Sequence, residues 1–125
     1  RADTTTYDGL QSNLAVSVWS GAYDPIAIVR NEELVLLKAE ANIGKGGDGL
    51  TEINAVRTAH GLAAASTGGI DQLLHEKRYS LFMEGHRWVD MRRYGKTAAL
   101  PNDRSDRGDK VFDSFPLPEA ETKGK

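Results

Sequence analysis

The clearest pattern in the chain is a helical spacing of apolar residues that begins about a quarter of the way along it. Leu34, Leu37 and Ala41 recur every three or four residues, and the stretch continues up to Gly44. Asn31 comes just before it, and an asparagine side chain suits the cap of a helix N-terminus. The pattern therefore predicts a helix that begins near Asn31 and ends near Gly44.

A second helix is predicted by Leu50, Ile53, Val56 and Ala59, which show the same spacing. Gly61 follows them, and glycine readily adopts the left-handed conformation that often ends a helix. The glycine-rich loop that joins the two helices is only a few residues long. We therefore expect the two helices to lie antiparallel.

The longest periodic stretch runs from Ile70 to Tyr94, before Gly95, and predicts a single helix about 37 Å long. At about 100° per residue, its apolar side chains fall within a sector of roughly 100°, the width of one buried stripe. We expect this helix to pack on the other two. The stripe contains Ile70, Leu73, Leu74, Leu81, Trp88 and Met91.

Three charged residues, Lys77, Glu84 and Arg92, fall in the same sector as the apolar stripe. Buried charges are costly unless they are paired, so we expect Glu84 to accept from an arginine or from backbone donors. A structural ion-pair network is favoured over a catalytic carboxylate, because no second carboxylate lies beside Glu84 on that face. Gly85 is interpreted as the site of a close helix crossing.

The ends of the chain differ from its helical centre. Residues 1–24 are rich in Thr, Ser, Asn, Gly and Asp, and we expect an extended, irregular arm there. Residues 25–119 form the predicted helical domain, which finishes in a loop segment with two prolines close together. Residues 120–125 are expected to be a frayed tail.

Composition narrows the function classes. A chain of 125 residues with 39% hydrophobic and 27% charged residues is ordinary for one soluble globular domain. Its net charge of −2 provides no long-range field to attract phosphate backbones, so we expect no nucleic acid as a partner. Because there is no cysteine, disulfides, thiolate metal sites and thiol nucleophiles are excluded.

Candidate catalytic and metal-binding residues are few. His86 and Asp90 are four residues apart on one face of the predicted helix, but two ligands do not complete a metal site. The sequence also contains no nucleophile elbow. We therefore predict no metal, no cofactor and no enzymatic activity. The alternative on these residues is a small metal-dependent hydrolase that uses Glu84, His86 and Asp90.

Aromatic residues in the N-terminal arm are the candidate ligand contacts. Tyr7, Trp19 and Tyr23 lie in an irregular stretch, where recognition residues are often found, and could stack on the apolar face of a sugar. The competing interpretation is that these side chains cover the hydrophobic core. We take Trp19 and Tyr23 as the predicted ligand-binding residues.

Four motifs occur in an order typical of one protein family. They are Arg30 to Asn42 (RNEELVLLKAEAN), Ile53 to Arg57 (INAVR) followed by Gly61-Leu62, Glu84 to Arg93 (EGHRWVDMRR), and Phe115 to Glu119 (FPLPE). In this order and spacing, the chain resembles the C-terminal part of the SusD/RagB-like nutrient-binding outer-membrane lipoproteins. The resemblance covers roughly residues 26–119.

The resemblance implies both a fold and a function. The fold would be mainly α: a tetratricopeptide-like antiparallel helix pair and a long packed helix, with an extended N-terminal arm and a C-terminal loop segment. The function would be non-catalytic binding of an oligosaccharide or another nutrient at the cell surface, in partnership with a SusC-like TonB-dependent transporter. The alternative is a helix-pair scaffold that binds proteins and has no glycan binding of its own.

The resemblance also sets expectations for location and for single residues. The full-length protein would lie on the outer membrane through a lipid anchor that this chain lacks, and the fragment itself would be soluble. Glu84, Arg87, Asp90 and Arg92 match the family's motif and are expected to be its structural signature rather than ligand contacts.

Overall fold

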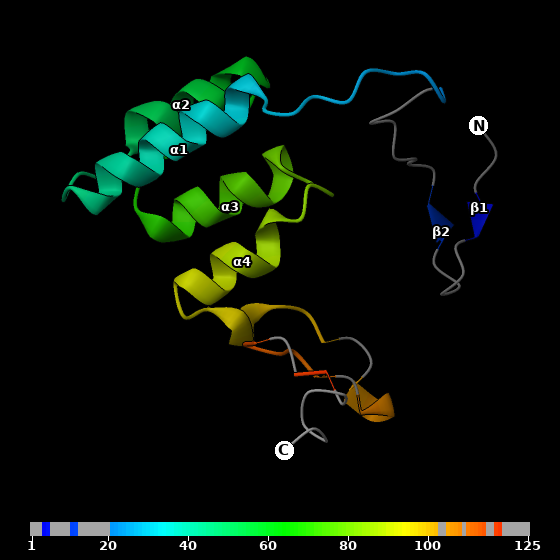
Figure 1. Cartoon of the computed structure of the whole chain (residues 1–125). Helices are drawn as coiled ribbons and strands as arrows, with labels where there is room; N and C mark the ends of the chain where they lie inside the picture. Colours follow the sequence, from blue (N-terminus) through cyan, green and yellow to red (C-terminus); the bar gives the residue numbers. More distant parts are fainter. Residues whose placement is uncertain are drawn as a thin grey trace.

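A computed structural model describes residues 4–5, 11–12, 21–102, 105–108, 110–114 and 117–118. These residues contain four α-helices, two short 3₁₀ helices and one pair of two-residue antiparallel strands (Figure 1). The helices are α1 (Asn31–Gly44), α2 (Leu50–Ala59), α3 (Ile70–Ser80), α4 (His86–Arg93), η1 (Thr97–Ala99) and η2 (Ser105–Arg107), and the strands are β1 (Thr4–Thr5) and β2 (Gln11–Ser12). The predicted class, mainly α, is confirmed.

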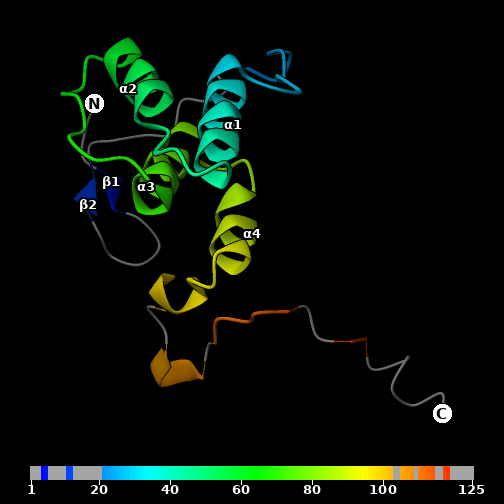
Figure 2. The same cartoon turned by 90° about the vertical axis from the view of Figure 1, so that its left-hand side faces the viewer.

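Helices α1 and α2 form the predicted antiparallel pair and lie side by side in both views (Figures 1 and 2). The end of α2 confirms the prediction for Gly61, which is left-handed with φ 68°. Its N–H donates to Thr58 O at 3.0 Å, and the N–H of Leu62 donates to Arg57 O at 2.9 Å. These two bonds satisfy carbonyls that the end of the helix would otherwise leave without donors.

The core lies where α3 crosses the helix pair. Leu36, Ala39, Ile53, Val56 and Leu73, from α1, α2 and α3, form one buried cluster. Leu36, Ile53 and Leu73 have no solvent exposure. Because each helix buries one apolar face against the other two, the three helices make a tetratricopeptide-like layered unit.

The prediction of a single helix from Ile70 to Tyr94 is wrong. The chain leaves the helix after Ser80 and re-enters it at His86, and two residues in this turn, Met83 (φ 65°) and Gly85 (φ 81°), are left-handed. Left-handed residues cannot continue a right-handed helix, so the axis changes direction here. The apolar spacing stays in phase across the turn, which is why periodicity alone indicates one helix.

Two further local predictions, for Gly85 and for Asn31, are also wrong. Gly85 is not a close helix crossing, because a Cβ at that position would meet no atom within 4 Å. Its role is the left-handed conformation that precedes α4. Asn31 is the first residue of α1 rather than its cap; extended Arg30 is the N-cap, and no side chain caps this end of the helix.

Beyond α4 the chain runs away from the helix pair, through η1 and on to the C-terminal segment (Figure 2). This segment is tied back to α4 by Trp88, whose indole N–H donates to the carbonyl of Phe112 at 2.7 Å. Among the described residues, no helix is both long and apolar enough to cross a membrane.

Candidate functional site

A buried ammonium group connects three helices. Lys77 on α3 is 8% exposed, and its Nζ donates to Glu40 Oε2 on α1 at 2.9 Å and to Asp90 Oδ1 on α4 at 3.0 Å. Glu40 also accepts from Arg93 at 2.9 Å and from the Tyr94 hydroxyl at 2.6 Å. Each buried charge thus has an opposite charge and hydrogen bonds, which is the condition for burying it without a large penalty.

This network shifts the pKa values of two of its members. Burial raises the pKa of Glu40, but hydrogen bonds from Tyr94, Lys77 and Arg93 outweigh it, so the net pKa lies below the ordinary value. Burial, together with the hydrogen bond to Glu40, raises the pKa of Tyr94 to about 12. The carboxylate therefore stays charged and the phenol stays protonated around neutral pH.

A second internal ion pair joins α2 and α3. Arg57 donates to Glu76, which is 4% exposed and also accepts from Gln72 at 2.7 Å. The other side of the Arg57 guanidinium donates to Ala63 O at 2.7 Å. This arginine therefore holds the loop after α2 against α3.

Glu84 has the predicted partner but not the predicted environment. Its Oε1 lies 2.7 Å from Arg30 Nη2, which confirms that an arginine pairs with it. The two side chains are 33% and 38% exposed, however, so the prediction of a buried network at Glu84 is wrong. The turn between α3 and α4 moves Glu84 out of the stripe, and Lys77 is the buried charge of that sector.

The other three residues of the predicted structural signature lie on α4. Arg87 Nη1 donates to Leu74 O on α3 at 3.3 Å, and Asp90 binds Lys77. The guanidinium of Arg92 lies 5.6 Å from the centre of the Trp88 ring, in a cation–π position, and is exposed rather than buried. Two of the three contacts thus join α4 to α3.

Of the two predicted ligand-binding residues, Tyr23 and Trp19, the structure describes only Tyr23. Tyr23 lies in a turn at residues 21–24, ahead of α1, and is 100% exposed, so it does not cover the core. Trp19 lies outside the described residues, as does Tyr7. Ligand binding by Trp19 and Tyr23 therefore stays a prediction for both residues.

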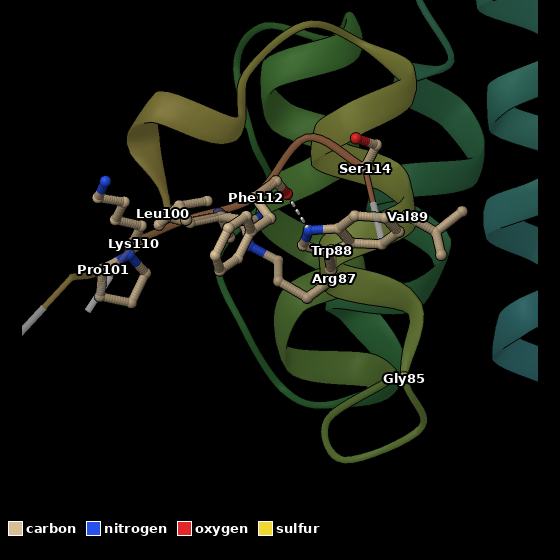
Figure 3. Close-up of a pocket in the computed structure, with 10 residues that line it drawn as sticks. Gly85, Arg87, Trp88, Val89, Leu100, Pro101, Lys110, Phe112 and Ser114 are labelled. Atoms are coloured by element: carbon tan, nitrogen blue, oxygen red, sulfur yellow. Dashed lines mark hydrogen bonds between the residues drawn. The ribbon is translucent and has the colours of Figure 1, made fainter. Parts of the chain in front are cut away.

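A cavity of about 660 Å³ lies between α4 and the C-terminal segment (Figure 3). Figure 3 shows the Trp88 indole beside the Phe112–Ser114 segment, with Leu100 and Pro101 on the other side of Phe112. The wall is mostly apolar. Its apolar residues are Trp88, Val89, Leu100, Pro101, Val111 and Phe112.

The charged residues of this cavity are all of one sign. Arg87 and Lys110 line it, and no carboxylate is among the described lining residues. An apolar wall with a few polar groups is the usual make-up of a small-molecule site. Sequence reasoning missed this cavity, because Trp88 and Phe112 are far apart along the chain and share no periodic pattern.

His86 and Asp90, the incomplete metal pair noted in the sequence, do not share a cluster of potential ligands among the described residues. Asp90 is buried against Lys77, whereas the His86 Nε2 lies 3.8 Å from Glu33 Oε1 on α1. Glu33, Glu84 and His86 instead offer ligand atoms that all lie within 4.8 Å of one another. The hydrolase alternative therefore lacks its predicted third ligand, Asp90.

The fold defines a class: a helical, tetratricopeptide-like scaffold, here with an apolar cavity between α4 and the C-terminal segment. The model of the SusD family (SusD_RagB) matches residues 11–124, so the chain belongs to the SusD family. Membership implies a glycan- or nutrient-binding component of the outer membrane rather than an enzyme. Searches of curated proteins and of solved structures find no match to the chain.

Proposed function

We propose that the chain is part of a non-catalytic protein that captures an oligosaccharide, or another nutrient, at the outer membrane and passes it to a SusC-like TonB-dependent transporter. The observation that carries this proposal is the match to the SusD family over residues 11–124. On this proposal the full-length protein is surface-exposed and held by a lipid anchor. It requires no cofactor and no nucleic acid.

Trp19 and Tyr23 are the first proposed contacts of the ligand. The full exposure of Tyr23 supports this role, because both faces of its ring are open to a sugar. Sugars stack well on aromatic rings, since the C–H groups of one sugar face are apolar while the hydroxyl groups remain at the edge. The segment before α1 would then act as one wall of the binding site.

The Trp88 cavity is proposed as a second contact for the same class of ligand. The indole supplies an apolar surface, and Lys110 and Arg87 supply positive charge without a competing carboxylate among the described lining residues. This charge favours a glycan that carries acidic groups, because an anionic ligand gains from two cations near an apolar wall.

Affinity electrophoresis of the full-length protein against gels that contain acidic or neutral polysaccharides tests these contacts. We expect retardation by at least one glycan, a loss of retardation in Tyr23→Ala, and a loss confined to acidic glycans in Lys110→Ala. Tyr79→Ala is the matched control, because this tyrosine is also exposed, at 61%, but lies on α3. Retardation that survives both Tyr23→Ala and Lys110→Ala would remove these contacts.

The alternative function, a helix-pair scaffold for protein partners, has its own supporting observation. Several large apolar side chains at the start of α1 and before it are half exposed or more, which is unusual for a surface that contacts only water. They are Ile26, Ile28, Val29, Leu34 and Leu37. If no glycan retards the full-length protein, the scaffold function is favoured instead.

A further inference from the structure

Three potential metal ligands converge between α1 and the turn that precedes α4. Glu33 lies in the first turn of α1, Glu84 in the turn between α3 and α4, and His86 at the start of α4. Their ligand atoms lie within 4.8 Å of one another, and Glu33 Oε1 is 3.8 Å from His86 Nε2. That distance is too long for a hydrogen bond, so the two groups face each other across a gap.

The spacing suits a metal ion placed between the groups. Four ligands at about 2.1 Å around zinc lie roughly 3.4 Å from one another. Because the three atoms here lie within 4.8 Å of one another, the most distant of them need to approach by up to about 1.4 Å. The three side chains are between 28% and 35% exposed, and none is locked in the core. Small side-chain rotations therefore suffice to close the site.

The charges at the gap also favour a cation. Glu33 and Glu84 carry two negative charges there, and among the described residues the ion pair with a lysine or arginine is that of Arg30 with Glu84, at 2.7 Å. Glu32, one residue before Glu33, pairs with His60 at 2.8 Å and with Arg30 at 3.9 Å. Arg30 contacts one oxygen of Glu84, Oε1. A carboxylate has two oxygens, so Glu84 can keep its arginine and still bind a metal.

The donor set selects the kind of metal. An imidazole nitrogen with two carboxylates matches zinc, which takes three protein ligands and a water molecule in open sites. Calcium and magnesium prefer oxygen ligands and use more of them, so an imidazole counts against both.

We propose that Glu33, Glu84 and His86 bind a divalent transition-metal ion, with zinc as the best fit. The ion would join α1 to the turn at residues 81–85 and so fix the position of α4. This proposal does not rest on the proposed glycan binding, and a negative result for one leaves the other unaffected.

Calorimetric titration of the full-length protein, without a histidine tag, with zinc chloride tests the site. We expect binding that falls at least about 100-fold in His86→Ala and in Glu33→Gln, more than the loss of an outer-shell group causes. His75→Ala is the matched control, because this exposed histidine on α3 lies outside the cluster, and its zinc affinity should be unchanged. Circular dichroism checks that every variant keeps its helices.

Arg30→Gln provides a test in the opposite direction. Removing the guanidinium beside Glu84 frees both carboxylate oxygens and removes a competing positive charge, so we expect zinc to bind more tightly. The proposal is overturned if zinc does not bind, if it binds His86→Ala as well as the parent protein, or if Arg30→Gln leaves the affinity unchanged or lower.

Discussion

At the scale of single residues, the buried ammonium of Lys77 is the charge on which the packing of three helices depends. It is held by carboxylates from α1 and α4, and Asp90 is only 4% exposed. Glu84 represents the opposite case, because its pair with Arg30 is about one-third exposed on both sides. The buried ion pairs of Lys77 should therefore contribute much more to the free energy of unfolding than the exposed Arg30–Glu84 pair does.

We predict that Lys77→Met lowers the free energy of unfolding by about 3 kcal/mol or more, because the methionine fills the space but leaves a buried carboxylate unpaired. Glu84→Ala should lower it by less than about 1 kcal/mol, since water already solvates that pair. Urea denaturation in metal-free buffer measures both. Lys96→Met is the control, because it removes a lysine whose ion pair with Asp71 is exposed. Its effect on the free energy of unfolding should match that of Glu84→Ala. Equal losses in Lys77→Met and Glu84→Ala would contradict this assignment.

At the scale of elements, the turn between α3 and α4 stores strain at Met83. This residue is left-handed with φ 65°, a conformation that costs an L-residue with a side chain roughly 1–2 kcal/mol. Gly85 adopts a similar conformation at φ 81° without that cost. The Met83 side chain is 59% exposed, so removing it loses little packing.

Substitutions in this turn should therefore have opposite signs. Met83→Gly should raise the free energy of unfolding by about 0.5 kcal/mol, because relief of strain exceeds the added entropy of the unfolded chain. Gly85→Ala should lower it by about 1 kcal/mol or more, because alanine must adopt the left-handed conformation. Gly44→Ala, at the helical end of α1, is the control and should not be destabilising. Thermal unfolding gives the three values, and a destabilised Met83→Gly would argue against stored strain.

The helices show what sequence periodicity can and cannot predict. Helices α1 and α2 were predictable within a few residues, because apolar spacing and glycine at their ends are local signals. The turn at residues 81–85 was not, because the apolar stripe continues in phase on both sides of it. The same error placed Glu84 and Arg92 in a buried sector, whereas of the three charged residues assigned to that sector only Lys77 is buried.

At the scale of the whole molecule, the candidate sites depend on contacts between distant parts of the chain. Trp88 meets Phe112, and Glu33 meets His86, only because helices pack and the C-terminal segment turns back. Neither contact has a signature in local sequence, so neither could be predicted from spacing. The family assignment was predictable, because it rests on motifs in order rather than on contacts.

Buried apolar side chains are unevenly distributed among the four α-helices of the described residues. The buried cluster of apolar side chains belongs to α1, α2 and α3, whereas α4 buries Met91 and Asp90 and is held to the rest largely through polar contacts. Regions with fewer buried apolar contacts open at lower free energy. Helix α4 and the cavity beside Trp88 should therefore be the less stable part of the molecule.

Hydrogen exchange measured by mass spectrometry tests this expectation in the full-length protein. We predict that amides of α4 and residues 97–102 exchange faster than those of α1 and α2, and that Lys77→Met widens the difference by releasing Asp90 and Glu40. A glycan bound at the Trp88 cavity should slow exchange in α4 selectively, because ligand binding stabilises the state that binds it. Uniform exchange across α1 to α4 would instead indicate one cooperative unit, in which a ligand at the cavity would stabilise every helix equally.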